Sequence, residues 1–332
     1  MRYLLLLFAF IIGCNANDST FTTNSFVITF GSCNKQYKKQ PLWNVILQND
    51  PNLWIWLGDV IYADTEDMSI MHQKYQQQLA RTSYQKFRNK VPVIGTWDDH
   101  DYGVNNGGKG YSSKKGSQRL FLDFLAEPQN SKRRMQKGIY WSHNYQTPKK
   151  RKVKVILLDT RYHCELPGKN ADILGKVQWK WLEQEIKTSE ADIHIICSSI
   201  QVLSRKHRYE KWANFPQARQ RLLRLLDTCK TVILLSGDRH FSEISKMKRR
   251  DLFPIYEVTS SGMTHSASIP VMILRKENEE YRVSDCFNKK NFGMITVNEN
   301  SQKIQLEIRD EKNRAVLEKN ISFSSIGVSD DK

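Results

Sequence analysis

The chain has 332 residues, of which 51 are Lys or Arg and 35 are Asp or Glu, so its formal net charge is +16. Hydrophobic residues make up 39% of the chain, enough to bury the core of one large domain and to exclude a disordered protein. After residue 12 no apolar run approaches the roughly 18–20 residues that a membrane-spanning helix needs. These properties exclude a multi-pass membrane protein. The positive charge suits anionic partners but identifies none.

The amino terminus resembles an export signal. Arg2 precedes an apolar stretch at residues 4–12 and small residues follow it, so we expect residues 1–16 to stay outside the fold. The signal can end in two ways: by cleavage after Ala16, or by lipidation of Cys14, because Ile-Ile-Gly-Cys at 11–14 resembles a bacterial lipobox. In the second case acyl groups anchor the protein to a membrane through a polar tether at 17–25. We therefore expect an exported protein, in the periplasm, at the cell surface or secreted.

From residue 26 onward, apolar runs typical of strands alternate with amphipathic segments typical of helices, which predicts an α/β fold. The predicted strands are residues 26–30, 53–57, 91–96, 139–143, 153–158, 193–197, 232–235, 255–258, 294–297 and 304–308. The predicted helices are residues 41–48, 68–80, 116–125, 175–188 and 216–228. From about residue 292 the pattern favours a small antiparallel end to a sheet, and residues 324–332 suit a solvated tail. Because no linker interrupts the pattern, we expect one domain at 26–323.

The cysteines do not form a disulfide scaffold. The chain has six, and five remain once Cys14 is removed or lipidated. Five is odd, so at least one thiol has no partner within the chain. Cys197 lies in an apolar run and is most simply interpreted as a small buried side chain.

Residues of metal-binding type recur where a predicted strand ends. In open α/β sheets ligands bind outside the carboxyl ends of strands, where short glycine turns let side chains converge. Four endings could therefore build one site. They are Gly-Ser-Cys-Asn at 31–34, Gly-Asp at 58–59, Asp-Asp-His-Asp at 98–101 and Gly-Asp-Arg-His at 237–240.

Each ending alone also has an ordinary structural interpretation. Asp59 follows a glycine, as in many turns, while Cys33 and His240 suit buried, hydrogen-bonded positions. The acidic run at 98–101 is harder to explain as a solvated loop, because it follows an apolar strand. Its carboxylates repel one another unless a cation or basic groups neutralise them.

Taken together, the order of the motifs resembles the calcineurin-like metallophosphoesterase superfamily, and their details resemble its alkaline phosphatase D (PhoD-like) family. The segments that carry the likeness are Phe-Gly-Ser-Cys-Asn at 30–34, Trp-Leu-Gly-Asp at 56–59, Thr-Trp-Asp-Asp-His-Asp-Tyr at 96–102, Leu-Leu-Asp-Thr-Arg at 157–161, Ser-Gly-Asp-Arg-His at 236–240 and Thr-Ser-Ser-Gly at 259–262. The resemblance implies a four-layer αββα sandwich. It also implies hydrolysis of phosphate mono- or diesters by a hydroxide that two metal ions activate.

The resemblance further implies roles for individual residues. Asp59 matches the carboxylate that both metals share. Asp99 replaces the Asn of the family's Asn-His motif, and Asp238 replaces the first His of the late motif. The expected metal ligands are Cys33, Asp59, Asp99, Asp238 and His240.

Two positions depart from the family pattern. A further superfamily ligand, a His before the late motif, has no evident counterpart, and Gln201 is the nearest candidate. The iron site of the PhoD-like family includes a Tyr two residues after the Cys, whereas this chain has Lys35 there.

The ligand types predict two or more metal ions that differ between the halves of the site. A thiolate and an imidazole, from Cys33 and His240, favour iron or zinc. Carboxylates at Asp59, Asp99 and Asp238 favour calcium, magnesium or manganese. The resemblance likewise implies iron with calcium.

Further residues are candidates for catalysis and substrate binding. His100 is suited to protonate the leaving group, with Asp101 or Asp98 orienting its ring. Arg161 and Arg239 are suited to grip phosphoryl oxygens, although each can instead form a structural ion pair. The candidates for lining the pocket are Asn34, Tyr62 and His265.

We therefore expect an exported, metal-dependent phosphoesterase whose partner is a phosphate-ester substrate. Two other classes remain open: an inactive cell-surface protein that binds anionic or phosphorylated ligands, and an extracellular nuclease. Basic runs at 132–134, 149–152 and 246–250 suit polyanions, membrane headgroups or simply solvated loops. No basic motif interleaved with aromatic residues is present, so we expect no obligate nucleic acid partner.

Overall fold

The structure is a computed structural model that describes residues 25–250, 252–268 and 280–323. The predicted export signal, the tether up to residue 24 and the tail at 324–332 lie outside the described residues. Ser25, predicted to end the tether, already begins the first strand. Among the described residues, no helix combines the length and apolar character needed to cross a membrane.

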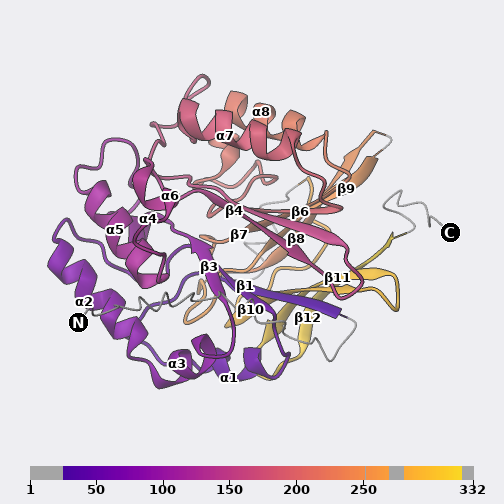
Figure 1. Cartoon of the computed structure of the whole chain (residues 1–332), viewed down its shortest axis with the longest axis horizontal. Coiled ribbons are helices and arrows are strands. Elements are labelled where there is room, and N and C mark those ends of the chain that lie inside the picture. The colour runs from indigo at the N-terminus through magenta and orange to yellow at the C-terminus, as the bar shows by residue number, and fades with distance from the viewer. Residues whose placement is uncertain (1–24, 251, 269–279, 324–332) are drawn as a thin grey trace, which may run out of the picture.

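Two six-stranded mixed sheets form the centre of the protein (Figure 1). The first sheet contains β1 (Ser25–Gly31), β2 (Leu53–Leu57), β3 (Val93–Thr96), β10 (Asn291–Asn298), β11 (Lys303–Asp310) and β12 (Ala315–Ser322). Its strand order is β12-β11-β10-β1-β2-β3, with β1, β2 and β3 parallel and β10, β11 and β12 joined antiparallel. The antiparallel end predicted from about residue 292 is therefore confirmed.

The second sheet places four parallel strands between two antiparallel neighbours. It contains β4 (Trp141–Gln146), β5 (Lys152–Leu157), β6 (Ile193–Cys197), β7 (Thr231–Ser236), β8 (Glu243–Arg249) and β9 (Leu252–Thr259). The strand order is β4-β5-β6-β7-β9-β8, in which β5, β6, β7 and β9 run parallel.

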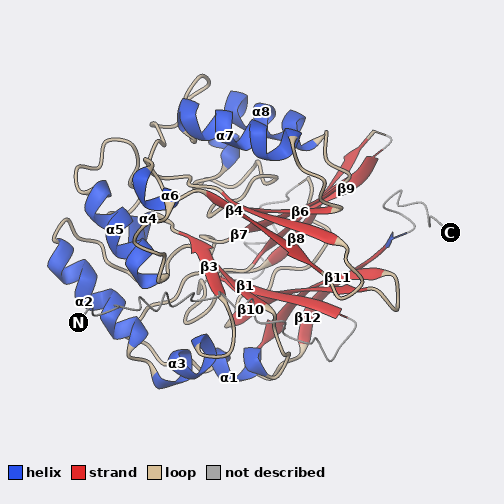
Figure 2. Ribbon diagram, in the orientation of Figure 1, coloured by secondary structure: helices blue, strands red, loops and turns tan. Residues whose placement is uncertain are grey.

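Helices cover the outer face of each sheet, which gives the four layers (Figure 2). On the first sheet lie α1 (Leu42–Leu47), α2 (Met68–Leu79), α3 (Thr82–Arg88), α4 (Asp99–Tyr102), α5 (Lys114–Phe124) and α6 (Lys132–Met135). On the second lie α7 (Gly175–Lys187), the 3-10 turn Trp212–Asn214 and α8 (Pro216–Leu226). The predicted αββα sandwich is thus confirmed.

Successive side chains along a strand point to opposite faces of the sheet, and this alternation produces the layers. In β1, Phe26, Ile28 and Phe30 pack between the two sheets, while Val27 packs under the helices. In β2, Trp54 turns to the helix side, where its ring meets Trp43 of α1 at 5.0 Å. Pro216 stands at the first turn of α8, where its missing N–H costs no hydrogen bond.

All ten predicted strands form, but the prediction missed two strands at the sheet edges. β8 and β12 carry several charged side chains and have one side without a strand neighbour, so their sequences lack an apolar run. The helices α3, α4 and α6 were missed because they are too short to show a helical period.

The carboxyl ends of the parallel strands meet at one edge of the sandwich. The hydroxyl of Ser32, just after β1, donates to the carbonyl of Ser260, just after β9, at 3.0 Å. Thr96 at the end of β3 donates to the carbonyl of Leu158 at 2.6 Å. Gly237 also lies at this junction, and a Cβ there would collide with the Ser32 side chain. The two sheets are therefore joined where the predicted site residues emerge.

Candidate metal centre

The predicted metal ligands leave the strand ends in an unusual backbone conformation. Cys33 (φ 60°), Asp59 (φ 52°), Asp238 (φ 65°) and His240 (φ 56°) all adopt left-handed backbone. This conformation costs a non-glycine residue roughly 1–2 kcal/mol. Four such residues at one edge of a sandwich indicate that a shared site, rather than local stability, fixes their geometry.

A deep cluster is formed by Cys33, Asp59, Tyr62 and His240. The Sγ atom of Cys33 lies 3.4 Å from Oδ2 of Asp59 and 3.0 Å from the hydroxyl of Ser261. Ligand atoms of Cys33, Asp59 and His240 all lie within 4.8 Å of one another. The three predicted ligands are therefore close enough to hold one metal ion.

Tyr62 adds a fourth donor to the deep cluster. Its hydroxyl donates to Oδ2 of Asp59 at 3.1 Å and lies 3.2 Å from Nε2 of His240, so Tyr62 belongs to the ligand cluster and not to the lining of the neighbouring cavity. Lys35, which occupies the position where the family pattern has Tyr, places its ammonium 4.9 Å from the centre of the Tyr62 ring. A tyrosine thus reaches the cluster from the turn after β2. His265 lies beside it, with Nε2 3.1 Å from the Tyr62 hydroxyl.

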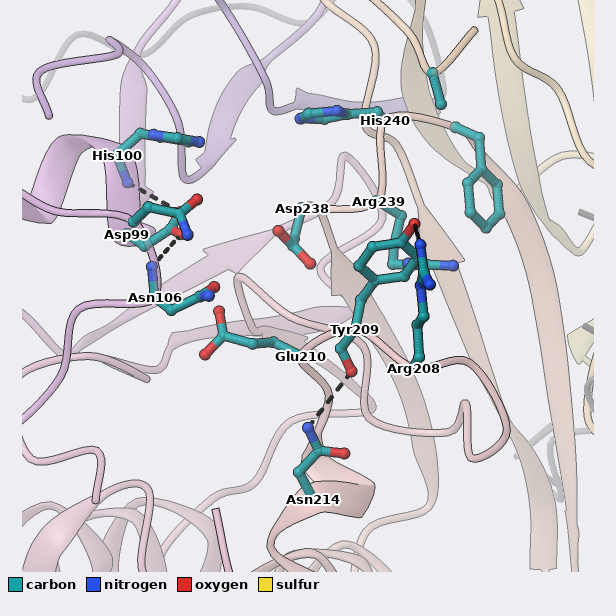
Figure 3. A pocket seen from close by; sticks show the side chains of 13 residues that line it. Asp99, His100, Asn106, Arg208, Tyr209, Glu210, Asn214, Asp238, Arg239 and His240 are labelled. Atoms are coloured by element: carbon teal, nitrogen blue, oxygen red, sulfur yellow. Dashed lines mark hydrogen bonds between the residues drawn. The ribbon is translucent and has the colours of Figure 1, made fainter. Parts of the chain in front are cut away.

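A second group of candidate ligands shares Asp59 with the first. Ligand atoms of Asp59, Asp99 and His100 lie within 4.8 Å of one another. Asp99 is held in place by two backbone N–H groups, which donate to its Oδ1 from His100 (2.9 Å) and to its Oδ2 from Asn106 (2.7 Å). Asp238 belongs to neither group and lines the adjoining cavity, where Figure 3 shows its carboxylate between Asp99 and Arg239.

The electrostatics of the site fit bound cations. Burial raises the pKa of Asp59, and the nearby Cys33 and Asp99 raise it further. Burial likewise raises the pKa of Asp238 to about 6 and that of Cys33 to about 11. Among the described residues, Oδ1 of Asp59 is buried without a hydrogen-bond partner. A buried carboxylate with an orphaned oxygen beside a thiol and an imidazole is a donor set that suits metal ions.

Asp64 orients His100, in place of the predicted Asp101 or Asp98. Nδ1 of His100 lies 2.6 Å from Oδ1 of Asp64, and its ring stacks on that of Tyr62 with centroids 4.0 Å apart. Burial opposes the charged imidazole, but the hydrogen bond with Asp64 and the charges of Asp59 and Asp99 outweigh it and raise the pKa of His100 to about 9.

Asp101, predicted to be catalytic, instead holds the backbone of the site. Its side chain is fully buried and accepts hydrogen bonds from the N–H groups of Asp98 (2.6 Å), Val60 (3.0 Å) and Asp59 (3.3 Å). It caps the short helix α4 and ties it to the turn after β2. Because its carboxylate is used for this, Asp101 positions the ligands and does not reach the cavity.

Arg161 also differs from the prediction, because its donors are used within the protein. Nε donates to Asp98 at 2.6 Å, and the two terminal nitrogens donate to the carboxylate of Glu210 at 3.1 and 2.9 Å. The carbonyl of Gly107 accepts a further, longer bond at 3.5 Å. The second N–H of the nitrogen that donates at 2.9 Å is taken by Oδ1 of Asp98 at 2.5 Å, so all five N–H donors have partners within the protein. The structural ion pair, left open by the sequence, is therefore the role that the structure supports.

Two further residues singled out from the sequence also use their amide donors within the protein. Asn34 is completely buried, and its amide donates to the carbonyl of Val60 (3.0 Å) and to Gln78 (2.8 Å), so it braces the loop instead of lining the pocket. The amide of Gln201 donates to Glu243 and Thr259 at 2.6 and 2.9 Å, so it is committed away from the ligand clusters.

A cavity of about 490 Å³ opens beside the second group (Figure 3). Arg239 lines it, and its guanidinium lies over the rings of Tyr209 and Phe241, 4.9 Å from each centre. The residues that line it are Asp99, His100, Asn105, Asn106, Arg208, Tyr209, Glu210, Asn214, Asp238, Arg239, His240, Phe241 and Ala267. Sequence reasoning missed residues 208–214, because this segment has no strand or helix period beside a recognisable motif.

Several solved structures share this fold. A structure titled "Structure of PhoD" matches with a TM-score of 0.70 at 15% identity, over 88% of this chain and 72% of that one. Purple acid phosphatase PPD1 from yellow lupin (Lupinus luteus) seeds matches with a TM-score of 0.62 at 12% identity, over 92% and 55%. A dimetal phosphatase from Danio rerio matches with a TM-score of 0.56 at 13% identity, over 90% and 99%. The fold is therefore that of the calcineurin-like metallophosphoesterases.

The family assignment comes from sequence. The PhoD-like phosphatase family matches residues 142–315, just over half of the chain, so the protein belongs to the PhoD-like phosphatase family. This match includes Arg161, Asp238, Arg239, His240 and His265, while the other predicted site residues precede it. No curated protein sequence matches the chain. Family and fold together make the protein a metallophosphoesterase, and the resemblance noted in its motifs is confirmed.

Proposed function

We propose that this protein is an exported enzyme that hydrolyses phosphate mono- or diesters with the help of two metal ions joined by Asp59. The observation that carries the proposal is the position of Asp59, which belongs to both groups of candidate ligands. Its second oxygen, buried without a hydrogen-bond partner among the described residues, is available for a cation. A carboxylate shared in this way would supply ligands to two cations, as in two-metal hydrolases.

The two halves of the site would hold different metals. Cys33, Tyr62 and His240 offer a thiol, a phenol and an imidazole beside Asp59, a set that favours iron or zinc. Asp99 and Asp238 offer carboxylate oxygens on the cavity side and favour calcium, magnesium or manganese. Bound there, the cations would supply Lewis acidity toward the phosphoryl oxygens and lower the pKa of a water molecule.

Side chains of the protein would donate the proton, bind the phosphoryl group and position the ligands. With Nδ1 engaged by Asp64, Nε2 of His100 is the atom that would carry a proton to the departing oxygen. The guanidinium of Arg239 would bind phosphoryl oxygens from the cavity wall. Asp101 would keep the backbone around Asp59 fixed through its three accepted hydrogen bonds.

Metal analysis combined with hydrolysis assays tests the proposal. We expect p-nitrophenyl phosphate or bis(p-nitrophenyl) phosphate to be hydrolysed by the protein as isolated. Dialysis against a calcium-selective chelator should abolish the activity reversibly and leave the deep metal bound. The Cys33→Ser variant should lose the transition metal preferentially. Full activity in protein stripped of metal would overturn the proposal.

Export is tested separately. If Cys14 is lipidated, Cys14→Ser should move the protein from the membrane fraction to the soluble exported fraction. Cys164→Ser, at a buried thiol elsewhere in the chain, is a matched control that should leave the fractionation unchanged. Mass spectrometry that finds an unmodified chain beginning at Asn17 would rule the anchor out and leave simple secretion.

A further inference from the structure

One side of the cavity carries polar groups that the proposed hydrolysis leaves unused. Glu210 lines the cavity together with Asn105 and Asn106. Figure 3 shows the carboxylate of Glu210 turned toward Asn106 and away from Arg208 and Tyr209. A carboxylate here is unexpected in a phosphatase, because it repels the phosphate that the neighbouring groups attract.

Arg161 holds the Glu210 carboxylate in a fixed orientation. Its two terminal nitrogens each donate to a different oxygen of Glu210, at 3.1 and 2.9 Å, and Asp98 anchors the guanidinium from the other side. The Arg161 side chain is 1% exposed and that of Glu210 is 19% exposed. A carboxylate can accept about four hydrogen bonds. With one bond per oxygen taken by Arg161, acceptor capacity remains on the side that faces the cavity.

The charges near Glu210 determine which chemical groups its remaining acceptor sites can bind. A second phosphate would be repelled by Glu210. An ammonium group would have to compete with Arg161, whose guanidinium already neutralises the Glu210 carboxylate. Neutral hydroxyl groups meet neither obstacle. They donate to a carboxylate, and the amides of Asn105 and Asn106 can both donate to them and accept from them.

We propose that Glu210, with Asn105 and Asn106, binds hydroxyl groups on the alcohol part of the substrate, so that the preferred substrates are phosphate esters of neutral polyhydroxy alcohols, such as sugars and polyols. This inference rests on the proposed function, because it requires the phosphate to lie at Asp59 and Asp99. Glu210 is then a residue that determines specificity, and Arg161 positions it.

A matched pair of substrates tests the proposal. Glycerol 1-phosphate and n-propyl phosphate have the same carbon chain and differ only in hydroxyl groups. The native protein, with its metals as isolated, should favour the glycerol ester in kcat/KM by about 10- to 100-fold, the usual weight of hydrogen bonds to a charged group. In Glu210→Gln this preference should fall to within about threefold, mainly through loss on the glycerol ester. Arg161 keeps Asp98 as its partner in this variant, so the fold should persist.

Controls separate recognition from other roles. Glu183→Gln removes the acid of an exposed Glu–Arg pair, Glu183–Arg221 at 2.7 Å, and should leave the preference intact. An equal loss on both esters in Glu210→Gln, a loss that added calcium restores, or faster hydrolysis of phosphocholine than of glycerol 1-phosphate would each overturn the proposal.

Calorimetry measures recognition of the alcohol part separately from hydrolysis of the ester. The native protein should bind glycerol 1-phosphate more tightly than n-propyl phosphate even where turnover is slow. Tighter binding of the glycerol ester with no hydrolysis of either ester would contradict the phosphoesterase proposal and support recognition by Glu210. Hydrolysis of both esters with equal affinities and rates would contradict the recognition of hydroxyl groups by Glu210 and would leave the phosphoesterase proposal standing.

Discussion

Asp59 and Asp159 are both buried carboxylates that follow strands at the same edge of the sandwich, yet their surroundings differ completely. Asp159 accepts four hydrogen bonds at 2.8–2.9 Å, from the Trp97 indole and from the N–H groups of Arg161, Tyr162 and Ile139. Asp59 accepts from the Tyr62 hydroxyl and contacts the Cys33 thiol, and its other oxygen is buried without a partner among the described residues.

This difference distinguishes carboxylates that stabilise the fold from carboxylates that bind a ligand. A buried carboxylate with every oxygen satisfied stabilises the fold, whereas one that is left unsatisfied costs free energy unless something else binds it. Asp101 resembles Asp159 in this respect, because its oxygens accept hydrogen bonds from the backbone. Asp99 combines both properties, since it accepts two backbone hydrogen bonds and also lines the cavity. Changes on the Asp59 side should therefore alter chemistry, and changes on the Asp159 side should alter stability.

Among substitutions that leave the proposed metal ligands in place, the largest effect is expected at His100, on the Asp59 side. His100→Asn should lower kcat by roughly 10²–10⁴, the usual contribution of a positioned acid or base. Metal content and the thermal unfolding midpoint should hardly change, because the proposed ligands of the cavity-side metal, Asp59, Asp99 and Asp238, are left in place. Steady-state kinetics would contradict the catalytic role if kcat survived and only KM rose, since His100 would then merely contact substrate.

The opposite outcome is expected at Asp159. Asp159→Ala would leave four buried donors without their acceptor and should lower the free energy of unfolding by about 3–5 kcal/mol. Urea unfolding measures this loss. In the fraction that stays folded, metal content per chain should match that of the native protein. Loss of metal without loss of stability would instead place Asp159 in the metal site.

Glu257 provides a pH test of a buried scaffold carboxylate that belongs to neither group of candidate ligands. It accepts hydrogen bonds from the N–H groups of Val202 (2.8 Å) and Leu203 (2.7 Å), but burial raises its pKa from 4.5 to about 7. Between these values the folded state holds more protons than the unfolded state. Its contribution to stability therefore falls as pH rises from about 4.5 to 7, by roughly 3 kcal/mol.

Comparison with Glu257→Gln isolates that contribution. The variant lacks the titrating group, so its free energy of unfolding should decline less than that of the native protein between pH 4.5 and 8. Denaturation curves at several pH values measure the difference. Parallel pH profiles for the two proteins would show that Glu257 ionises as freely in the folded state as in the unfolded state.

A smaller effect is expected at Asp64, which touches the site only through His100. Asp64→Asn should keep a hydrogen-bonding group near Nδ1 but lose its charge, and should lower kcat by about tenfold, as is usual for a residue that orients a functional group. Asp67→Asn, at the exposed N-cap of α2, is a nearby control that should leave kcat unchanged. An unchanged kcat in Asp64→Asn would mean that Tyr62 stacking alone orients His100.

The layers of the fold and the inner part of the site could be predicted because both follow from apolar runs. Each buried strand stands out as such a run, and parallel strands bring their carboxyl ends to one edge. Cys33, Asp59 and His240 could be grouped for that reason, and the structure brings them together. Edge strands such as β8 gave no such signal, because their polar side chains hide the alternation.

The roles of individual polar residues could not be predicted in this way. A sequence shows that Arg161 and Asp101 are charged, but not that their hydrogen bonds are used within the protein. Most of those partners, such as Glu210 for Arg161 and Val60 for Asp101, come from segments tens of residues away. Tyr62 and Glu210 escaped correct prediction for the converse reason: each reaches the site from a turn or loop whose path depends on the packing of the whole sandwich.

The most direct test of the shared role of Asp59 is the metal content of Asp59→Asn. The native protein should contain about two metal ions per chain of different elements. The variant should lose most of both ions together with its activity, and its thermal unfolding after metal removal should match that of the metal-stripped native protein. A variant that keeps both metals, or that loses only one, would show that no single carboxylate joins the two halves of the site.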